Sequence, residues 1–289
     1  MSRRRRDLGL NIAFALLFIG GAWWLGAAAL GSFDYNWGWR QALSYLVRSD
    51  GNGGWAAGLL LDGFLMTLRL ALWGGVACTL FGLAIGLLSA SRFLALRMLG
   101  AAYVEGVRNM PPLVFIFVIY FFVSTQVLPP ALVSSIGDAV ESSAVLTWLF
   151  GPDDRIENFL AGLLTIALYE AAYVAEIFRG GIQSIEKGQW EASDALGLRR
   201  WQAMRLVILP QAFRKIVPPY TNQLISLVKD SSIISVISVQ ELTFSGIEVA
   251  TTTGRLFETL LLVAGMYMII CYPATMLLRR LERPQAARL

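Results

Sequence analysis

Residues 189–201 read Gln-Trp-Glu-Ala-Ser-Asp-Ala-Leu-Gly-Leu-Arg-Arg-Trp, and the polar segment that holds them runs on to Leu209-Pro210. The pattern predicts a short helix with small residues and the Glu191 carboxylate on one face, then a break at Gly197. A second amphipathic turn follows and is predicted to end at the proline. Strongly apolar stretches lie on both sides of this segment. We expect a protein outside the membrane to bind it.

The apolar stretches indicate an integral membrane protein. The 289 residues are 56% hydrophobic and 15% charged, against about 45–50% and about 25% in soluble domains. Several windows exceed the roughly eighteen nearly uncharged residues that cross a bilayer core. Six spans are predicted, over residues 8–30, 64–90, 101–127, 159–178, 220–244 and 257–278. Pro111-Pro112 interrupts the third span and predicts a kink.

The distribution of charge predicts how these spans are oriented. Basic residues are in excess at the amino terminus, in the 91–100 and 179–219 loops and in the tail, whereas acids dominate residues 124–158. With six spans, all four basic segments fall on the cytoplasmic face, as the positive-inside rule requires. The predicted fold is therefore an all-α integral membrane protein with six transmembrane helices and both termini cytoplasmic.

The same reading divides the chain into three parts. Residues 1–62 are predicted to be a cytoplasmic basic N-terminus, the first transmembrane helix and an extracytoplasmic loop. Residues 63–281 form the core domain, with an extracytoplasmic insertion over about 124–158 and a cytoplasmic loop over about 180–219. Residues 282–289 are a cytoplasmic tail. A cleaved signal peptide is the alternative for the first span, but an apolar run of about 23 residues exceeds the usual 7–15 and favours a retained helix.

Several kinds of chemistry are not expected. The chain has no histidine, which removes imidazole bases, haem ligands and histidine metal sites. It lacks the Gly-x-x-x-x-Gly-Lys-Ser/Thr phosphate loop, so it cannot drive itself with ATP. No nucleophile elbow or basic run interleaved with aromatics occurs, so neither covalent catalysis nor nucleic-acid binding is expected. Cys78 and Cys271 lie in separate apolar runs and are predicted to be buried thiols rather than a disulfide.

The cytoplasmic loop resembles that of the membrane-spanning permease subunits of ATP-binding cassette (ABC) importers, in the polar amino acid branch. Its hallmark of Glu-Ala-Ala, a later Gly and then Leu-Pro is matched by Glu191-Ala192-Ser193, Gly197 and Leu209-Pro210, with Ser193 as a small-for-small change. Four flanking stretches are also similar to this branch: Arg108–Leu113, Tyr169–Ile182, Pro218–Gln223 and Lys229–Ser232. The resemblance covers about residues 63–281.

The resemblance implies a type I ABC importer permease fold and a set of partners. These are a dimer of ABC ATPase subunits that bind ATP and Mg, a second permease subunit (a copy or a paralogue), and a periplasmic or surface substrate-binding protein. The implied substrate is an amino acid, and the implied location is the bacterial inner membrane. No metal or cofactor is expected in this chain, and it is not expected to be an enzyme.

Two groups of residues are predicted to carry this function. The ATPase-coupling residues are Glu191, Ala192, Ser193, Ala195, Leu196, Gly197 and Leu198. Ala192, Ala195 and Ala203 would let a helix pair seat closely in a partner's groove, and Glu191 could pair with a basic residue there. The alternative is that these are ordinary surface helices. The predicted substrate-pathway residues are Glu170, Asn222, Gln223, Lys229 and Asp230, because polar groups inside a membrane are functional candidates by default.

Other interpretations stay open. Lys229-Asp230 could be a structural helix–helix pair or a local cap. Glu176 with Arg179, and Glu105 with Arg108, have the i,i+3 spacing of ion pairs. The alternative function is that of an ion-coupled secondary amino acid carrier, which works without an ATPase. Such a carrier would need ligands for the coupling ion and usually has recognisable repeats. An intramembrane enzyme is disfavoured, since no nucleophile–base set is present.

Overall fold

The computed structural model describes scattered positions between residues 14 and 24, then residues 35–49, 54–91 and 93–286, with side chains described as far as Leu277. The chain divides into two units, Met1–Trp39 and Arg40–Leu289. Most of the first predicted span lies outside the described residues, although its described positions are helical. Whether this span is retained therefore stays a prediction.

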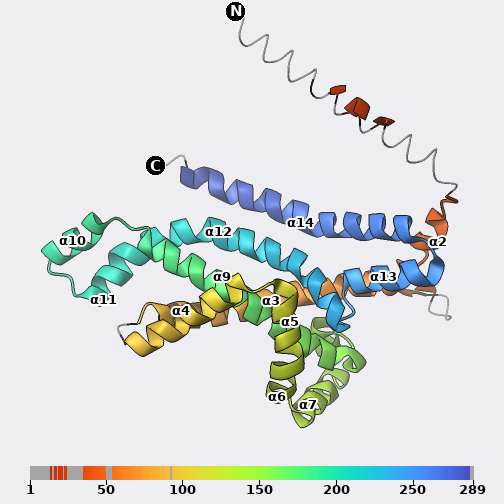
Figure 1. Ribbon diagram of the computed structural model, residues 1–289, viewed down its shortest axis with the longest axis horizontal. Helices are drawn as coiled ribbons and strands as arrows, with labels where there is room; N and C mark the ends of the chain where they lie inside the picture. Colours follow the sequence, from red (N-terminus) through yellow and green to blue (C-terminus); the bar gives the residue numbers. More distant parts are fainter. Residues whose placement is uncertain are drawn as a thin grey trace, which may run out of the picture. The chain divides into compact units, whose positions relative to one another are not determined.

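The second unit begins with short elements and is built around a pair of long helices. Helix α2 (Trp39–Leu43) is followed by the antiparallel strands β1 (Val47–Ser49) and β2 (Trp55–Ala57). Helix α3 (Leu59–Ser89) then packs along α9 (Ile156–Gln183), which coincides with the predicted fourth span and extends it at both ends (Figure 1). A Cβ atom at Gly82 would lie 2.6 Å from Val174 Cγ1. Glycine therefore permits this close approach of the two backbones.

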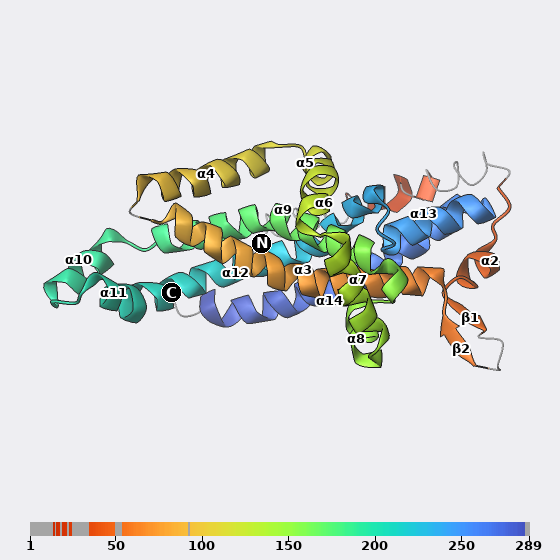
Figure 2. The same ribbon diagram turned by 90° about the horizontal axis from the view of Figure 1, so that it is seen from below.

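The interruption predicted at Pro111-Pro112 within the span 101–127 is confirmed, and it is a sharp break instead of a kink. Helix α4 (Leu94–Asn109) ends at Met110, and the chain from Pro112 to Val127 leaves at 120° to it (Figure 2). That second stretch consists of α5 (Pro112–Val118), the π-helical turn η1 (Ile119–Ser124) and α6 (Thr125–Val127). Met110 and Pro111 adopt extended backbone conformations. A residue before proline avoids the helical region, so two successive prolines stop one helix and start another.

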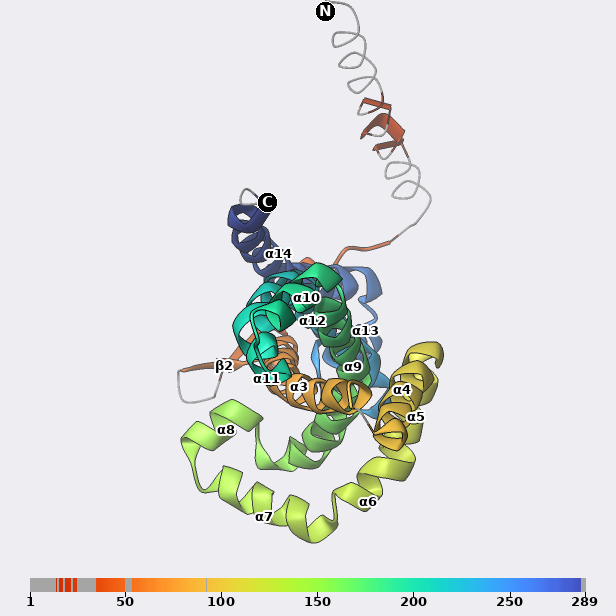
Figure 3. The same cartoon turned by 90° about the vertical axis from the view of Figure 1, so that its left-hand side faces the viewer.

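Residues 124–158 are mostly helical and pack against α3. They form α7 (Pro130–Glu141), α8 (Ala144–Phe150) and the 3₁₀ turn η2 (Asp153–Arg155), which with α5 and α6 lie beside α3 and α9 (Figure 3). The indole of Trp73 donates to the Leu149 carbonyl at 3.1 Å and stacks on Phe150 at 4.8 Å between ring centroids. Arg69 donates to the Trp148 carbonyl at 2.9 Å. Backbone carbonyls thus hold two side chains of α3 in place.

The predicted fifth span begins earlier than expected. Helix α12 starts at Leu209 rather than near residue 220 and runs to Asp230, with Pro218 and Pro219 inside it. Helix α11 (Arg200–Ala203) and the π-helical turn η3 (Met204–Ile208) lead directly into it, so Pro210 does not end the second amphipathic turn. Pro210 lies where the π-helical turn η3 passes into α12.

The chain then bends once more before its last helix. The 3₁₀ segment η4 (Ser231–Ile237) follows α12, and α13 (Leu242–Thr253) lies at 52° to the preceding helix. Helix α14 (Leu256–Ala286) extends beyond the predicted sixth span. By length and composition the described residues contain three membrane-spanning helices, or five if each bent pair is one span. The count of six and the cytoplasmic termini stay predictions.

Candidate functional site

The predicted coupling segment forms a helix pair at one end of the second unit. Helix α10 (Lys187–Ala195) is followed by a sharp turn and by α11, and both lie beyond the ends of α9 and α12 (Figures 1 and 3). Gly197 has φ +70° in this turn, and its amide donates to the Asp194 carbonyl at 2.9 Å. The left-handed backbone explains why glycine follows the helix here. The predicted break at Gly197 is confirmed.

The small residues of the helix pair point in two directions. Ser193 and Ala203 are each only 1% exposed, and Ser193 donates to the Gln189 carbonyl at 2.7 Å. These two residues therefore pack within this protein instead of lying on the outer surface. Glu191, Ala192 and Ala195 are exposed. Leu198 is half-buried, whereas Gly197 and Leu196 are exposed, the latter to 78%.

A cluster of apolar residues joins the helix pair to the membrane helices. Ile185, Ile208, Ala212 and Ile216 form its buried part, with Trp190 packed against it. Lys215 Nζ also donates to the Ser184 carbonyl at 2.7 Å, and Gln211 Nε2 donates to Gln189 Oε1 at 3.0 Å. Packed side chains of this kind resist deformation, so α10 and α11 are held to the ends of α9 and α12.

The outer surface of the helix pair and of the adjoining η3 turn combines exposed apolar side chains with charges. Leu196, Trp201 and Leu206 are between 62% and 78% exposed. The Arg205 guanidinium lies 5.2 Å from the Trp201 ring centroid. Exposed large apolar residues rimmed by charge are typical of protein-binding surfaces. Sequence reasoning missed Trp201 and Leu206, although the amphipathic second turn carried the signal.

The structure brings some of the predicted pathway residues together inside the membrane helices. The Glu170 side chain is fully buried in α9, and Gln223 Nε2 of α12 donates to its Oε2 at 2.6 Å. The other oxygen, Oε1, has no hydrogen-bond partner among the described residues. Asp230 of α12 also interacts electrostatically with this carboxyl group. Glu170, Gln223 and Asp230 thus form one polar group between α9 and α12, in which Glu170 is fully buried and the other two are half-buried.

Asn222 and Lys229 are separate from that group. Both are exposed, and they lie seven residues apart on α12, which places them on one side of the helix. Within the described part of the chain the Lys229 ammonium makes no ion pair of 4.0 Å or less. The roles of Lys229 and Asp230, as pathway residues or as a structural pair or cap, stay predictions.

A charged cluster lies between α4 and α9. The Arg179 Nη2 atom is 2.5 Å from Glu176 Oε1, as the i,i+3 spacing predicted, and Arg108 Nη1 is 3.7 Å from the same oxygen. The expected pair of Glu105 with Arg108 is not formed, because Arg108 turns toward α9 and also lies 5.8 Å from the Tyr173 ring. These residues line a cavity of about 410 Å³.

A buried carboxyl group that sequence reasoning missed joins three elements. Glu241 is fully buried before α13 and accepts the amide of Phe244 at 2.9 Å, which makes it the helix N-cap. It also accepts hydrogen bonds from Tyr267 of α14 at 2.6 Å and from Thr67 of α3 at 3.3 Å. We read this as a structural site, because its ionised form is satisfied from three directions. No cluster of three or more metal-ligating side chains occurs within the described residues.

Comparison with known proteins identifies the family. A model of the binding-protein-dependent transport system inner membrane component matches residues 82–285. The probable glutamine ABC transporter permease protein GlnM of Bacillus subtilis is 32% identical over 225 residues, which cover 78% of this chain and 92% of that protein. The glutamine transport system permease protein GlnP of Escherichia coli K12 is 36% identical over the same shares.

Solved structures agree with this assignment. A chain of an amino acid ABC transporter, crystallised with histidines, superimposes with a TM-score of 0.64 at 32% identity and covers 78% of this chain and 94% of its own. A chain of the MetNI methionine ABC transporter, in an inward-facing conformation, gives 0.56 at 21% identity, over 77% and 95% of the two chains, and so supports the fold alone. The matches over most of the chain show that this protein belongs to the family of inner membrane components of binding-protein-dependent transport systems, the permease subunits of ABC importers.

Proposed function

We propose that this chain is a permease subunit of an ATP-driven amino acid importer and that a separate ATPase moves it through the α10–α11 pair. The relatives are permeases of glutamine and of glutamate/aspartate import, so the reading as an ion-coupled carrier is not favoured. The observation that carries the proposal is the protruding helix pair. It has an exposed apolar surface and a glycine turn, and the chain that bears it lacks a phosphate loop.

The coupling mechanism follows from the continuity of the helices. Residues 200–237 form a single helical stretch that begins at α11 and ends beyond Asp230. A displacement of the helix pair is therefore transmitted along α12 to the positions that meet α9. Gln223 is the point on α12 that contacts Glu170. Packed helices move as rigid bodies between discrete arrangements, so a push at one end changes the contact at the other.

Each part of the helix pair has a role in this proposal. Glu191 supplies a charge that a basic groove of the ATPase can pair with. Leu196 and Leu198 supply apolar contact, and Ala192 and Ala195 keep the exposed face of α10 narrow enough to enter a groove. Gly197 makes the turn that presents them. Ser193 keeps α10 attached to this protein's own helices, because it is buried.

The proposed assembly contains partners that this chain requires. Two ATPase subunits bind ATP and Mg on the cytoplasmic side, a second permease subunit completes the pathway, and a binding protein delivers the amino acid from outside the inner membrane. In the pathway, Glu170 is the buried group, Gln223 and Asp230 are half-buried, and Asn222 and Lys229 are exposed. The Glu170–Gln223 hydrogen bond links α9 and α12 in the conformation described here.

Reconstitution tests this function. The chain is placed in proteoliposomes with its ATPase, partner permease and binding protein, and uptake of a ¹⁴C-labelled mixture of the twenty protein amino acids is measured. We expect uptake that requires ATP and both soluble partners. Uptake by this chain alone under a sodium or proton gradient, without ATP, would instead support the carrier.

A further inference from the structure

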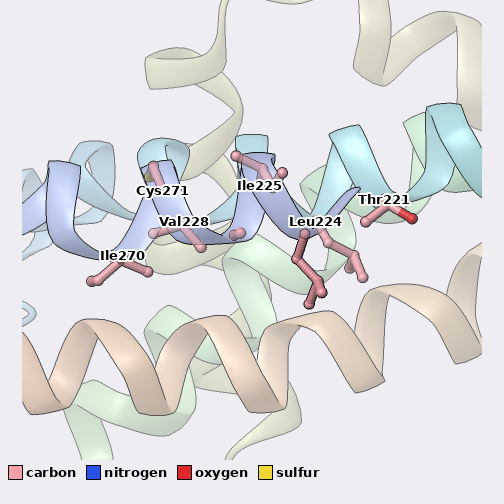
Figure 4. A pocket seen from close by; sticks show the side chains of 8 residues that line it. Thr221, Leu224, Ile225, Val228, Ile270 and Cys271 are labelled. Atoms are coloured by element: carbon pink, nitrogen blue, oxygen red, sulfur yellow. The ribbon is translucent and has the colours of Figure 1, made fainter. Parts of the chain in front are cut away.

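The cavity between α4 and α9 is lined by charged side chains. It has a volume of about 410 Å³ and is bordered by three arginines and two glutamates: Arg97, Arg108, Arg179, Glu105 and Glu176. A cavity of about 200 Å³ between α12 and α14 differs from it, because its walls are almost wholly apolar (Figure 4). Since the arginines outnumber the acids, the α4–α9 cavity favours an anionic ligand.

One arginine of this cavity has no counter-ion within the described part of the chain. Glu176 is already engaged, because it accepts Arg179 Nε at 2.8 Å and lies 3.7 Å from Arg108 Nη1. Glu105 is eight residues, or about 12 Å, along α4 from Arg97. Arg97 is exposed and makes no ion pair of 4.0 Å or less with any described residue. Its charge is therefore available to a ligand.

Further hydrogen-bond donors line the same cavity. Arg179 donates Nη1 to Gln183 Oε1 and Nε to Glu176, and its guanidinium has other N–H groups to offer. Gln183 accepts through its oxygen, so its NH₂ group is a donor. Ser89 Oγ is a buried atom that has no hydrogen-bond partner among the described residues. Guanidinium groups beside neutral donors are typical of sites for phosphate.

The cavity lies where two long helices end. Helices α3 and α9 have 31 and 28 residues, so they are about 46 Å and about 42 Å long. Both exceed the hydrocarbon core of a bilayer, which is about 30 Å thick. Ser89 is the last residue of α3 and Gln183 is the last of α9, and α10 follows at this end (Figure 2). The cavity is therefore at the level of the lipid headgroups.

An exposed apolar stripe runs along α4 beside the charged cavity. Met98, Leu99 and Ala102 form it and lie on one side of the helix, with Met98 exposed to 60% and Leu99 to 65%. The stripe is next to the side that carries Arg97 and Ala101, which border the cavity. Acyl chains can cover such a stripe while their headgroup occupies the cavity, whereas a soluble phosphate ester leaves it uncovered. The two features together match a phospholipid.

We infer that the α4–α9 cavity binds the phosphate group of an anionic phospholipid of the cytoplasmic leaflet, through Arg97, Arg179 and Gln183. The inference rests on the proposed function for one point, the position of the coupling segment on the cytoplasmic side. Basic pockets between transmembrane helices on that side hold anionic headgroups. Phosphate oxygens accept charge-assisted hydrogen bonds from guanidinium groups. The bound lipid joins α4 to α9 beside the coupling segment.

The first test measures lipid binding to the purified permease. Native mass spectrometry gives the Kd of the first bound molecule of dioleoylphosphatidylglycerol, which is anionic, and of dioleoylphosphatidylcholine, which carries no net charge. We expect the wild type to prefer the anionic lipid and Arg97→Gln to weaken its binding about tenfold, as the loss of one charged hydrogen bond implies. Arg97→Lys should keep most of the affinity. Arg214→Gln, at an exposed position of α12, is the matched control and should equal the wild type.

Two results of this measurement would overturn the inference. One is an equal affinity of the wild type for both lipids, and the other is an unchanged Kd in Arg97→Gln. A competition arm separates the two sources of phosphate. Glycerol 3-phosphate carries the phosphate without acyl chains, and we expect it not to displace the lipid at equal concentration. Displacement would identify a soluble phosphate ester as the ligand and refute the lipid site.

The second test identifies what covers the apolar stripe in a membrane. A photoreactive amino acid replaces Met98 in the assembled transporter, and the cross-linked products are analysed by mass spectrometry. We expect adducts with phospholipids in which anionic lipids are enriched over their share of the membrane, and we expect Arg97→Gln to remove this enrichment. Cross-linking to a second permease subunit would instead show that the stripe is a subunit interface, which contradicts the inference.

The two proposals fail in different ways. Lipid affinity is measured without ATP, the ATPase, the binding protein or an amino acid. If the wild-type assembly shows no ATP-driven uptake, the proposed function fails whatever lipid is bound. If uptake depends on ATP and the permease does not distinguish the anionic lipid, the function stands and the phospholipid site is wrong.

Discussion

Gln223 and Glu170 are fifty-three positions apart in sequence, and the side-chain amide of the first donates a 2.6 Å hydrogen bond to the carboxylate of the second. The bond joins α12, which begins at the coupling segment, to the middle of α9. Glu170 is fully buried and its second oxygen has no partner in the described structure. The proposed motion of α12 would change this contact.

Replacing Glu170 tests whether that contact serves transport. Glu170→Gln keeps the shape but replaces the carboxyl group by an amide, whose NH2 group would have no acceptor at the unpartnered position of Oε1, and an unsatisfied buried donor costs about 1–3 kcal/mol. We expect uptake to fall about tenfold while the ATPase stays bound. Gln223→Glu on α12 is the companion variant, and the double exchange of Glu170→Gln with Gln223→Glu should recover part of the activity. Unchanged uptake and specificity in Glu170→Gln remove this residue from the pathway.

The turn at Gly197 gives a second prediction. A side chain at φ +70° is strained by about 1–2 kcal/mol, and the strain changes how α10 is presented. Gly197→Ala should weaken ATPase binding, measured as the fraction that co-purifies, while the permease still inserts in the membrane. Gly188→Ala is the control, because an added Cβ there meets nothing within 4 Å and its φ is ordinary. Equal loss of ATPase binding in both variants would show that the loop tolerates no substitution. Equal retention of ATPase binding would show that the Gly197 turn is not needed for it.

The exposed surface of the helix pair gives a third prediction. Trp201 is 62% exposed, and the Arg205 guanidinium lies over its ring. Truncating Trp201 therefore removes contact area without opening a cavity in the core. If the surface binds the ATPase, Trp201→Ala should weaken the complex by about 2 kcal/mol, as expected for an aromatic interface anchor. Trp148→Ala, at a 72% exposed position on α8, is the matched control and should bind normally. Titration of the ATPase against each purified permease measures the difference.

The packing of α3 on α9 gives a prediction about stability. A Cβ at Gly82 would meet Val174 Cγ1 at 2.6 Å and the Ala171 carbonyl at 3.0 Å. Gly82→Ala should therefore destabilise the permease by about 1–3 kcal/mol, the usual effect of overpacking. Gly106→Ala, where the added atom meets nothing within 4 Å, should leave the melting temperature unchanged. Partial recovery in Gly82→Ala combined with Val174→Ala would confirm the contact, and an unchanged melting temperature in Gly82→Ala would refute it.

The buried Glu241 gives a second stability prediction. Glu241→Ala removes the cap of α13 and leaves the buried hydroxyl of Thr67 without the acceptor of its hydrogen bond. Caps contribute about 1 kcal/mol, and an orphaned buried donor costs about 1–3 kcal/mol, so the melting temperature should fall clearly. Glu248→Ala, at an exposed position of α13, is the control. A normal melting temperature in Glu241→Ala would show that water replaces the carboxylate.

Much of the fold could be read from local sequence. The break at Gly197 was predictable because glycine marks a left-handed turn after a helix. The glycines at helical spacing in α3 predicted its close packing against a neighbouring helix, which is α9. The direction of the chain after Pro111-Pro112 was not predictable, since prolines tell where a helix is interrupted but the 120° angle depends on what the next segment packs against.

The sequence predicts which residues belong to the candidate site better than it predicts how those residues are arranged. Glu170 and Gln223 could be named as polar groups within spans, but their contact depends on the register between two helices. The start of α12 at Leu209 was missed because Pro218 and Pro219 suggested a loop. Ser193 was expected on the docking face, yet it is buried, because which side of a nine-residue helix faces inward is decided by the cluster around Ile208.

Photo-cross-linking from Leu196 tests most directly whether the ATPase binds this permease at the α10–α11 pair. Leu196 is 78% exposed beside the Gly197 turn, so a photoreactive amino acid there reaches any protein seated on the pair. In the assembled transporter we predict one cross-linked product that contains this chain and the ATPase, with a yield that changes when ATP is added. Cross-linking to the substrate-binding protein, or none at all in an assembly that hydrolyses ATP, would contradict the account.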